Sequence, residues 1–174
     1  IISYLLGAFP FGLWIGQTFF KKNLHDYGSG NAGTTNASRI LGIKAGSLVF
    51  MFDLLKGTLA ILLPLIFHIN GVSPLLLGLL AVIGHTFSIF DQFKGGKAVA
   101  TPAGVILGFS PFFFLYLIAI FILSVWLFSM VSHSSIIAAS FILFGIFVFP
   151  SIKFILTSYN LLFSIIMVAI SILI

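Results

Sequence analysis

The sequence predicts an all-α polytopic membrane protein with about seven transmembrane helices. Of its 174 residues, 60% are hydrophobic and only 6% are charged, and the mean hydropathy is +1.28. A soluble domain carries roughly 25% charged residues, and a disordered chain has low hydrophobicity. A chain as apolar as this one fits helices in lipid, whose backbone polar groups are all bonded within the segment.

A helix needs about 20 apolar residues to cross a bilayer, and seven segments are candidates. They cover residues 1–20, 46–67, 74–90, 98–109, 111–131, 136–149 and 154–174, of which the fourth is short. No charged linker or change in composition divides the chain, so we expect residues 1–174 to form a single transmembrane domain. Because the chain starts without Met and ends within an apolar run, we expect it to be truncated at both ends.

Two polar stretches interrupt the apolar pattern: a first island at residues 21–45 and a second island at residues 91–97. Seven crossings place both islands on the same side of the membrane. With the N-terminus outside, the cytoplasmic side receives six of the eight basic residues, namely Lys21, Lys22, Arg39, Lys44, Lys94 and Lys97. The outer side receives Lys153. The positive-inside rule therefore predicts an outside N-terminus and islands that face the cytoplasm.

The few charges limit the possible chemistry. The chain has three Asp, no Glu, no Cys and a net charge of +5. Thiolate metal sites, disulfides and a Cys nucleophile are excluded, and paired-carboxylate catalysis or an acidic metal cage is disfavoured. The positive charge instead indicates anionic partners, either lipid headgroups or a phosphorylated substrate.

The first island contains the run GSGNAGTTN, residues 28–36, followed by Arg39. Glycines let backbone N–H groups approach an anion, and hydroxyl and amide side chains add donors. A helix starting near Thr34 would turn its N-terminal amides toward the same pocket, where Arg39 could grip a phosphate. The alternative is a flexible polar loop, in which Gly, Ser and Asn are common.

The second island places Lys94 and Lys97 on either side of Gly95 and Gly96, so that two ammonium groups could face one polyanion. The alternative is that these lysines anchor the chain at the headgroup level. His85, at the end of an apolar segment, is a general base, a phosphate ligand or a histidine satisfied by a backbone carbonyl. The other histidines, His25, His68 and His133, lie at expected membrane interfaces and are assigned no role.

Asp53 and Lys56 lie three residues apart in the second apolar segment and so share one helical face. A lone charge in hydrocarbon is costly, so we expect a mutual ion pair that faces the interior of the bundle. The pair would support the wall of the site, or serve purely as a structural ion pair.

Three stretches, GSGNAGTTNASR, DLLKG and GHTFSIFDQFKGGKAVAT, together resemble the bacterial membrane-integral glycerol-3-phosphate acyltransferase family that uses acyl-phosphate as donor. The resemblance implies seven spans in the bacterial cytoplasmic membrane and acyl transfer to the 1-hydroxyl of glycerol 3-phosphate. It implies acyl-phosphate, glycerol 3-phosphate and membrane lipid as partners, and no metal, cofactor or nucleic acid. It also implies a third cytoplasmic block, bearing Asn and His, beyond Ile174.

Matched to the family's motifs, Ser29, Lys97 and His85 are the expected catalytic residues. The expected substrate-binding or phosphate-binding residues are Gly30, Asn31, Thr35, Asn36, Arg39, Lys94, Gly95 and Gly96. Three positions depart from the family's usual pattern: Thr34 replaces Ala, Ser88 replaces Pro and Ala98 replaces Gly. No covalent nucleophile is needed because acyl-phosphate is already activated, and the base is either a substrate phosphate or His85.

Two rival interpretations exist for the same composition. A small anion transporter or channel would use the Gly-rich islands as selectivity elements, although no inverted repeat is visible and the polar residues avoid the midplane. A purely structural membrane subunit would leave both islands without a purpose.

Overall fold

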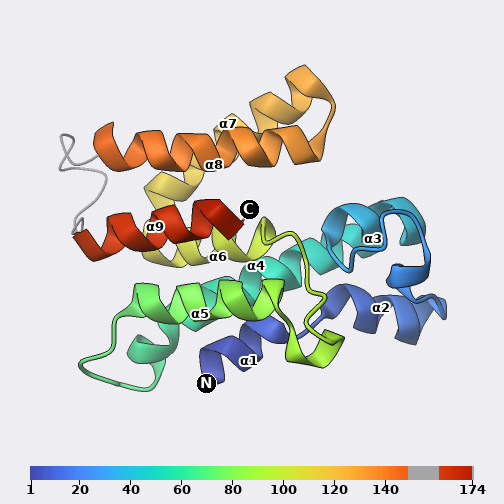
Figure 1. Ribbon diagram of the computed structural model, residues 1–174, viewed down its shortest axis with the longest axis horizontal. Helices are drawn as coiled ribbons and strands as arrows, with labels where there is room; N and C mark the ends of the chain where they lie inside the picture. The colour runs from blue at the N-terminus through green and yellow to red at the C-terminus, as the bar shows by residue number, and fades with distance from the viewer. Residues whose placement is uncertain (149–160, 174) are drawn as a thin grey trace.

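The computed structural model describes residues 1–148 and 161–173, and within these ranges the chain is helical and contains no β-strand (Figure 1). The α-helices are α1 (Ile2–Ala8), α2 (Phe11–Phe20), α3 (Thr34–Leu41), α4 (Ile43–Ile66), α5 (Pro74–Thr86), α6 (Ala100–Phe109), α7 (Pro111–Phe128), α8 (Val131–Val148) and α9 (Leu161–Leu173). Among the described residues, the 3₁₀ turn η1 (Leu24–Asp26) lies within the first island, and the 3₁₀ turn η2 (Ile89–Asp91) leads into the second. The all-α class predicted from the sequence is confirmed.

The first apolar segment, expected as one span, is divided into α1 and α2. Phe9 adopts an extended conformation with φ −64° and ψ 120°, because Pro10 lacks an N–H and restricts the residue before it. The carbonyl oxygens of Ala8 and Phe9 consequently point to side chains from other segments: Ser88 Oγ donates to Ala8 and Lys56 Nζ donates to Phe9. This break in the first segment supplies hydrogen-bond acceptors to buried polar side chains, Lys56 of α4 and Ser88 of the loop after α5.

Among the described residues, three segments are long and apolar enough to cross a membrane: α4 with 24 residues, Pro74–Asp91 (α5 and η2) with 18, and α7 with 18. The fourth expected segment forms α6, which has only 10 residues and is about 15 Å long at 1.5 Å per residue. The sixth corresponds to α8. Of the seventh, only α9 lies within the described residues, so the total of seven crossings stays a prediction.

The centre of the bundle is built where α4, α5 and α6 approach each other closely. A Cβ on Gly57 of α4 would collide with the backbone carbonyl of Thr101 in α6, and one on Gly104 of α6 would collide with the carbonyl of Leu54. Small residues at such crossings let helix backbones touch in lipid. A larger cluster of buried apolar side chains extends from this crossing to α7, α8 and α9, and a smaller one packs α2, η1 and α3 against α4.

The two islands lie at the same end of the bundle, while the connection between α4 and α5, residues 67–73, lies at the opposite end (Figure 1). The first island runs through η1 to α3, whose start at Thr34 is where the sequence indicated a helix. The second island follows η2 and leads into α6. The fold therefore brings the two chemically unusual segments of the sequence together.

Replacing Gly57 by Leu should destabilise the protein, because the new side chain would have to occupy the space of the α6 backbone. Overpacking of this kind costs about 1–3 kcal/mol, so we expect thermal unfolding in detergent to begin several degrees lower. Leu59→Ile, at an exposed position of the same helix, is the matched control and should leave the unfolding temperature unchanged. Equal unfolding temperatures for Gly57→Leu and the control would contradict this packing.

Candidate active site

A surface hollow of about 400 Å³ lies where the two islands meet. Its walls consist of Ser29, Gly30 and Asn31 from the first island, Phe93, Lys94, Gly95 and Gly96 from the second, together with His25 and Thr86. Six of these nine residues, all except His25, Thr86 and Phe93, are expected site residues from the sequence. A second, narrower crevice shares Gly95 and Gly96 with the hollow and reaches Asp53 and His85.

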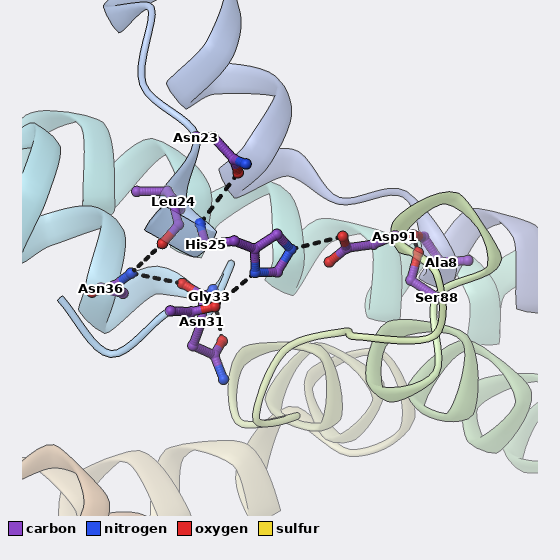
Figure 2. A network of polar contacts seen from close by, with 10 residues as sticks. Ala8, Asn23, Leu24, His25, Asn31, Gly33, Asn36, Ser88 and Asp91 are labelled. Carbon is purple, nitrogen blue, oxygen red and sulfur yellow. Dashed lines mark hydrogen bonds and ion pairs between the residues drawn. The ribbon is translucent and has the colours of Figure 1, made fainter. Parts of the chain in front are cut away.

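Asn36 organises the first island from within. It is buried, and the two protons of its amide Nδ2 are shared among the carbonyls of Leu24, Tyr27 and Asn31 at 3.0–3.1 Å. Its Oδ1 accepts from the backbone N–H of Ser29 at 3.0 Å. Figure 2 shows Asn36 beside Leu24 and Asn31. The sequence marked Asn36 for phosphate binding, but its amide is fully occupied by the loop, which favours a positioning role.

His25 joins the first island to the second. Its Nδ1 lies 2.7 Å from the Gly30 carbonyl, and its Nε2 lies 2.7 Å from Asp91 Oδ1. Figure 2 shows the side chains of His25 and Asp91 facing each other. The residue precedes the Gly-rich run in sequence and was assigned no role from it. Sequence patterns give little indication of this role, because His25 and its partner Asp91 are separated by 66 positions.

Gly95 and Gly96 cap the C-terminal end of α5. Their backbone N–H groups donate to the carbonyls of Thr86 at 3.1 Å and His85 at 3.0 Å, which lie among the last carbonyls of the helix and lack partners within it. These two amides are therefore engaged and do not point at an anion in the hollow. The glycines are required here because a Cβ on Gly95 would collide with the His85 carbonyl, and one on Gly96 with the His85 ring.

The second island and the residue that follows it have left-handed backbone at residues other than glycine. Gln92 and Phe93 in the island, and Ala98 directly after it, have φ values of 50°, 62° and 47°, in a region that favours glycine. Ala98, which stands where the resemblance implies Gly, is completely buried. Ser88, which stands where it implies Pro, is also buried and donates its hydroxyl to the Ala8 carbonyl, which a proline could not do.

A buried ammonium group, that of Lys56, lies below the second island. Its Nζ is 2.8 Å from Asp53 Oδ1, 2.8 Å from His85 Nδ1 and 3.0 Å from the Phe9 carbonyl. Lys56 and Asp53 are only 2% and 3% exposed, so the ion pair expected from their spacing is present and faces the interior. The contacts with His85 and Phe9 are hydrogen bonds and the contact with Asp53 is an ion pair, so the ammonium is both paired and hydrogen-bonded.

The surroundings of His85 limit what its ring can do. Because Nδ1 accepts a hydrogen bond from the Lys56 ammonium, the neutral ring carries its proton on Nε2, the atom that lies against Gly96. The ring is buried and belongs to the narrow crevice rather than to the open hollow. His85 thus supports the Gly95–Gly96 turn, and its role as a base stays a prediction.

The remaining expected residues lie at the surface. Thr35, Arg39 and Lys97 are exposed and do not line the hollow. No hydrogen bond or ion pair engages the side chains of Arg39 or Lys97 within residues 1–148 and 161–173. Both are long, charged side chains next to the two islands, so they are free to swing toward an anion. Their roles stay predictions.

The lining of the hollow is polar and includes one ammonium group. In the part of the chain that the structure describes, no group of three His, Asp or Glu side chains is arranged to hold a metal ion. The hollow instead offers the Lys94 ammonium, the hydroxyl of Ser29 and the amide of Asn31. A polar hollow with one cationic side chain thus lies at one end of an apolar helical bundle whose long helices could cross a membrane.

Comparison with known proteins gives the family. The model of the family described as glycerol-3-phosphate acyltransferase matches residues 1–174. The chain belongs to this family and is an acyltransferase of the membrane, in agreement with the resemblance drawn from its motifs.

Relatives cover the whole chain. Glycerol-3-phosphate acyltransferase of Lactococcus lactis subsp. cremoris (strain MG1363) is 77% identical over 174 residues, which cover 100% of this chain and 82% of that protein. The enzyme of the same name from Streptococcus gordonii (strain Challis) is 62% identical over 168 residues, which cover 97% of this chain and 78% of that protein.

Two solved structures share the fold. The crystal structure of PlsY (YgiH), an integral membrane glycerol 3-phosphate acyltransferase, in its glycerol 3-phosphate form gives a TM-score of 0.86 at 34% identity, covering 99% of this chain and 82% of that one. The lysophosphatidic acid form gives a TM-score of 0.82 at 34% identity, covering 98% of this chain and 81% of that one. Both are described as an integral membrane protein, which confirms the predicted membrane class.

Replacing Lys56 by Met should destabilise the protein strongly, because it leaves the Asp53 carboxylate buried without its cation. Breaking a buried ion pair in this way costs about 3–5 kcal/mol, whereas removing both charges costs less. We therefore expect the double variant Asp53→Asn/Lys56→Met to unfold in detergent at a higher temperature than Lys56→Met does. Lys44→Met, at an exposed position near the start of α4, is the control. A double variant no more stable than Lys56→Met would disprove the coupling.

Proposed function

We propose that the protein transfers a fatty acyl group from acyl-phosphate to the 1-hydroxyl of glycerol 3-phosphate. The products are lysophosphatidic acid and inorganic phosphate, and the reaction is the first step of phospholipid synthesis. The observation that carries the proposal is the hollow that joins Ser29, Gly30 and Asn31 to Lys94 at one end of an apolar bundle. Both substrates are anions and one has an acyl tail, so they require this combination of a polar site and lipid.

The reaction needs no covalent intermediate on the protein. The 1-hydroxyl oxygen of glycerol 3-phosphate attacks the acyl carbon, a new C–O bond forms, and the C–O bond to phosphate breaks as phosphate leaves. Donors such as the Ser29 hydroxyl and the Lys94 ammonium stabilise the developing oxyanion and the departing phosphate. Lys97 and Arg39, exposed beside the islands, add positive charge when an anion is bound.

The hydroxyl proton requires an acceptor. His85 is a poor candidate in the described arrangement because its Nδ1 already accepts from Lys56 and its Nε2 lies against Gly96. Asp53 and Asp91 are engaged with Lys56 and His25. A phosphate oxygen of the bound substrates is therefore the acceptor that we favour.

We further propose that the chain is one domain with seven crossings of the bacterial cytoplasmic membrane, with its N-terminus outside and the hollow on the cytoplasmic side. The close contact between the two islands supports this topology, because an even number of crossings must separate them. Six of the eight basic residues belong to the islands, which the positive-inside rule assigns to the cytoplasm.

The direct test is an assay of purified protein in detergent with acyl-phosphate and glycerol 3-phosphate, in which phosphate release and lysophosphatidic acid are measured together. We expect equal amounts of both products, and phosphate release that depends on glycerol 3-phosphate. Replacing acyl-phosphate by a fatty acyl thioester of coenzyme A should abolish product formation. Lack of both products from the chain at full length would overturn the proposal.

Arg39→Ala should raise the KM for glycerol 3-phosphate, because it removes a cation that can form two hydrogen bonds to a phosphate. The loss of one such charged contact is expected to change KM by about tenfold. Lys44→Ala removes another exposed base of the first island and should leave KM within about twofold. Identical kinetics in the two variants would exclude Arg39 from the binding of glycerol 3-phosphate.

A further inference from the structure

His25 occupies a position between two acceptors. The Gly30 carbonyl accepts hydrogen bonds but cannot donate them, and the same is true of an ionised Asp91 carboxylate. With both ring nitrogens 2.7 Å from these oxygens, the ring has to donate twice. Only the imidazolium form of histidine carries a proton on each nitrogen.

The neighbouring groups reinforce this arrangement. The backbone N–H of His25 donates to Asn23 Oδ1 at 3.2 Å, which fixes the start of the η1 turn. Asp91 is only 7% exposed, and its Oδ2 has no hydrogen-bond partner among the described residues. A buried carboxylate with so few partners depends on the cation that it contacts.

The charges around the ring act in both directions. Burial lowers the pKa of His25, but the hydrogen bonds to Asp91 and Gly30 and the charge of Asp91 raise it, while Lys94 opposes them. The net result is a pKa above the usual value of 6.5. The stabilising contact is therefore complete below pH 6.5 and is lost as the pH rises through the higher pKa of the folded protein.

We propose that His25, as an imidazolium ion, is the positioning residue that clamps the two islands together and so sets the spacing of the anion-binding hollow. It reaches the Gly30 carbonyl next to Ser29 on one side and the η2 turn that precedes Lys94 on the other. The inference rests on the proposed function and adds to it a residue for binding of the phosphorylated substrates. The ring is not a catalytic residue, because both of its protons are engaged within the protein.

The kinetic experiment compares the wild-type protein with His25→Arg and His25→Gln between pH 6 and pH 9. Arginine remains charged and can donate twice, whereas glutamine is neutral. The titration of the substrate's phosphate affects the KM of every variant equally. The ratio of the wild-type KM to the His25→Arg KM therefore reports only the effect of pH on His25. His133→Gln, the same substitution at an exposed histidine of α8, is the matched control.

At the acidic end, we expect His25→Gln to raise the KM for glycerol 3-phosphate about tenfold, the effect of losing a charged hydrogen bond. His25→Arg should stay within about threefold of the wild type there, with kcat changed less than KM in both variants. The wild-type to His25→Arg ratio of KM should rise with pH, and His133→Gln should follow the wild type. A ratio that is constant from pH 6 to pH 9 would overturn the proposal.

A second readout does not depend on acyl transfer. In protein labelled with ¹³C-histidine, the resonance that disappears in His25→Gln identifies His25. We expect it to titrate above pH 6.5, and to titrate at lower pH in Asp91→Asn. Titration at or below 6.5 in the wild type, or no change in Asp91→Asn, would disprove the clamp even if the enzyme were active. A confirmed titration in a protein without acyltransferase activity would instead reject the proposed function alone.

Discussion

The interaction on which the rest of the structure depends is the placement of one ammonium group, that of Lys56, inside an apolar bundle. A charge in such surroundings is tolerated only when it is paired and hydrogen-bonded. Asp53 supplies the opposite charge from the same helix, His85 supplies a hydrogen-bond acceptor from α5, and the break before α2 supplies the Phe9 carbonyl. The kink at Pro10 is therefore part of the solvation of Lys56 and not a local irregularity of the first segment.

The contacts of Lys56 also determine the arrangement of the surface hollow. Lys56 fixes the tautomer of His85, and the His85 ring fills the space that a side chain at position 96 would need. The glycine turn can then close over the end of α5 and present Lys94 at the hollow. Ser88, which donates to the Ala8 carbonyl, and Tyr4, whose hydroxyl lies 2.7 Å from the Phe87 carbonyl, attach the same loop to α1. The polar centre and the surface site are thus one connected structure.

Local spacing made much of this predictable. The ion pair of Asp53 and Lys56 follows from their separation by three residues, and the start of α3 follows from the polar run before Thr34. The motifs also identified most of the hollow. What could not be predicted depends on contacts between distant segments, such as the link between His25 and Asp91 and the use of the glycine amides as caps. Pro10 indicates that the first segment is divided, but a criterion based on apolar length alone predicts a single span.

The capping of α5 by Gly95 and Gly96 has a mechanical consequence. Since the same two hydrogen bonds complete the helix and shape the loop, the loop cannot swing open as a lid without fraying the end of α5. The second island is therefore the stiff wall of the hollow. Any widening that admits a substrate falls to the first island, where Ser29 lines the hollow and is exposed, and to the flexible side chain of Lys94.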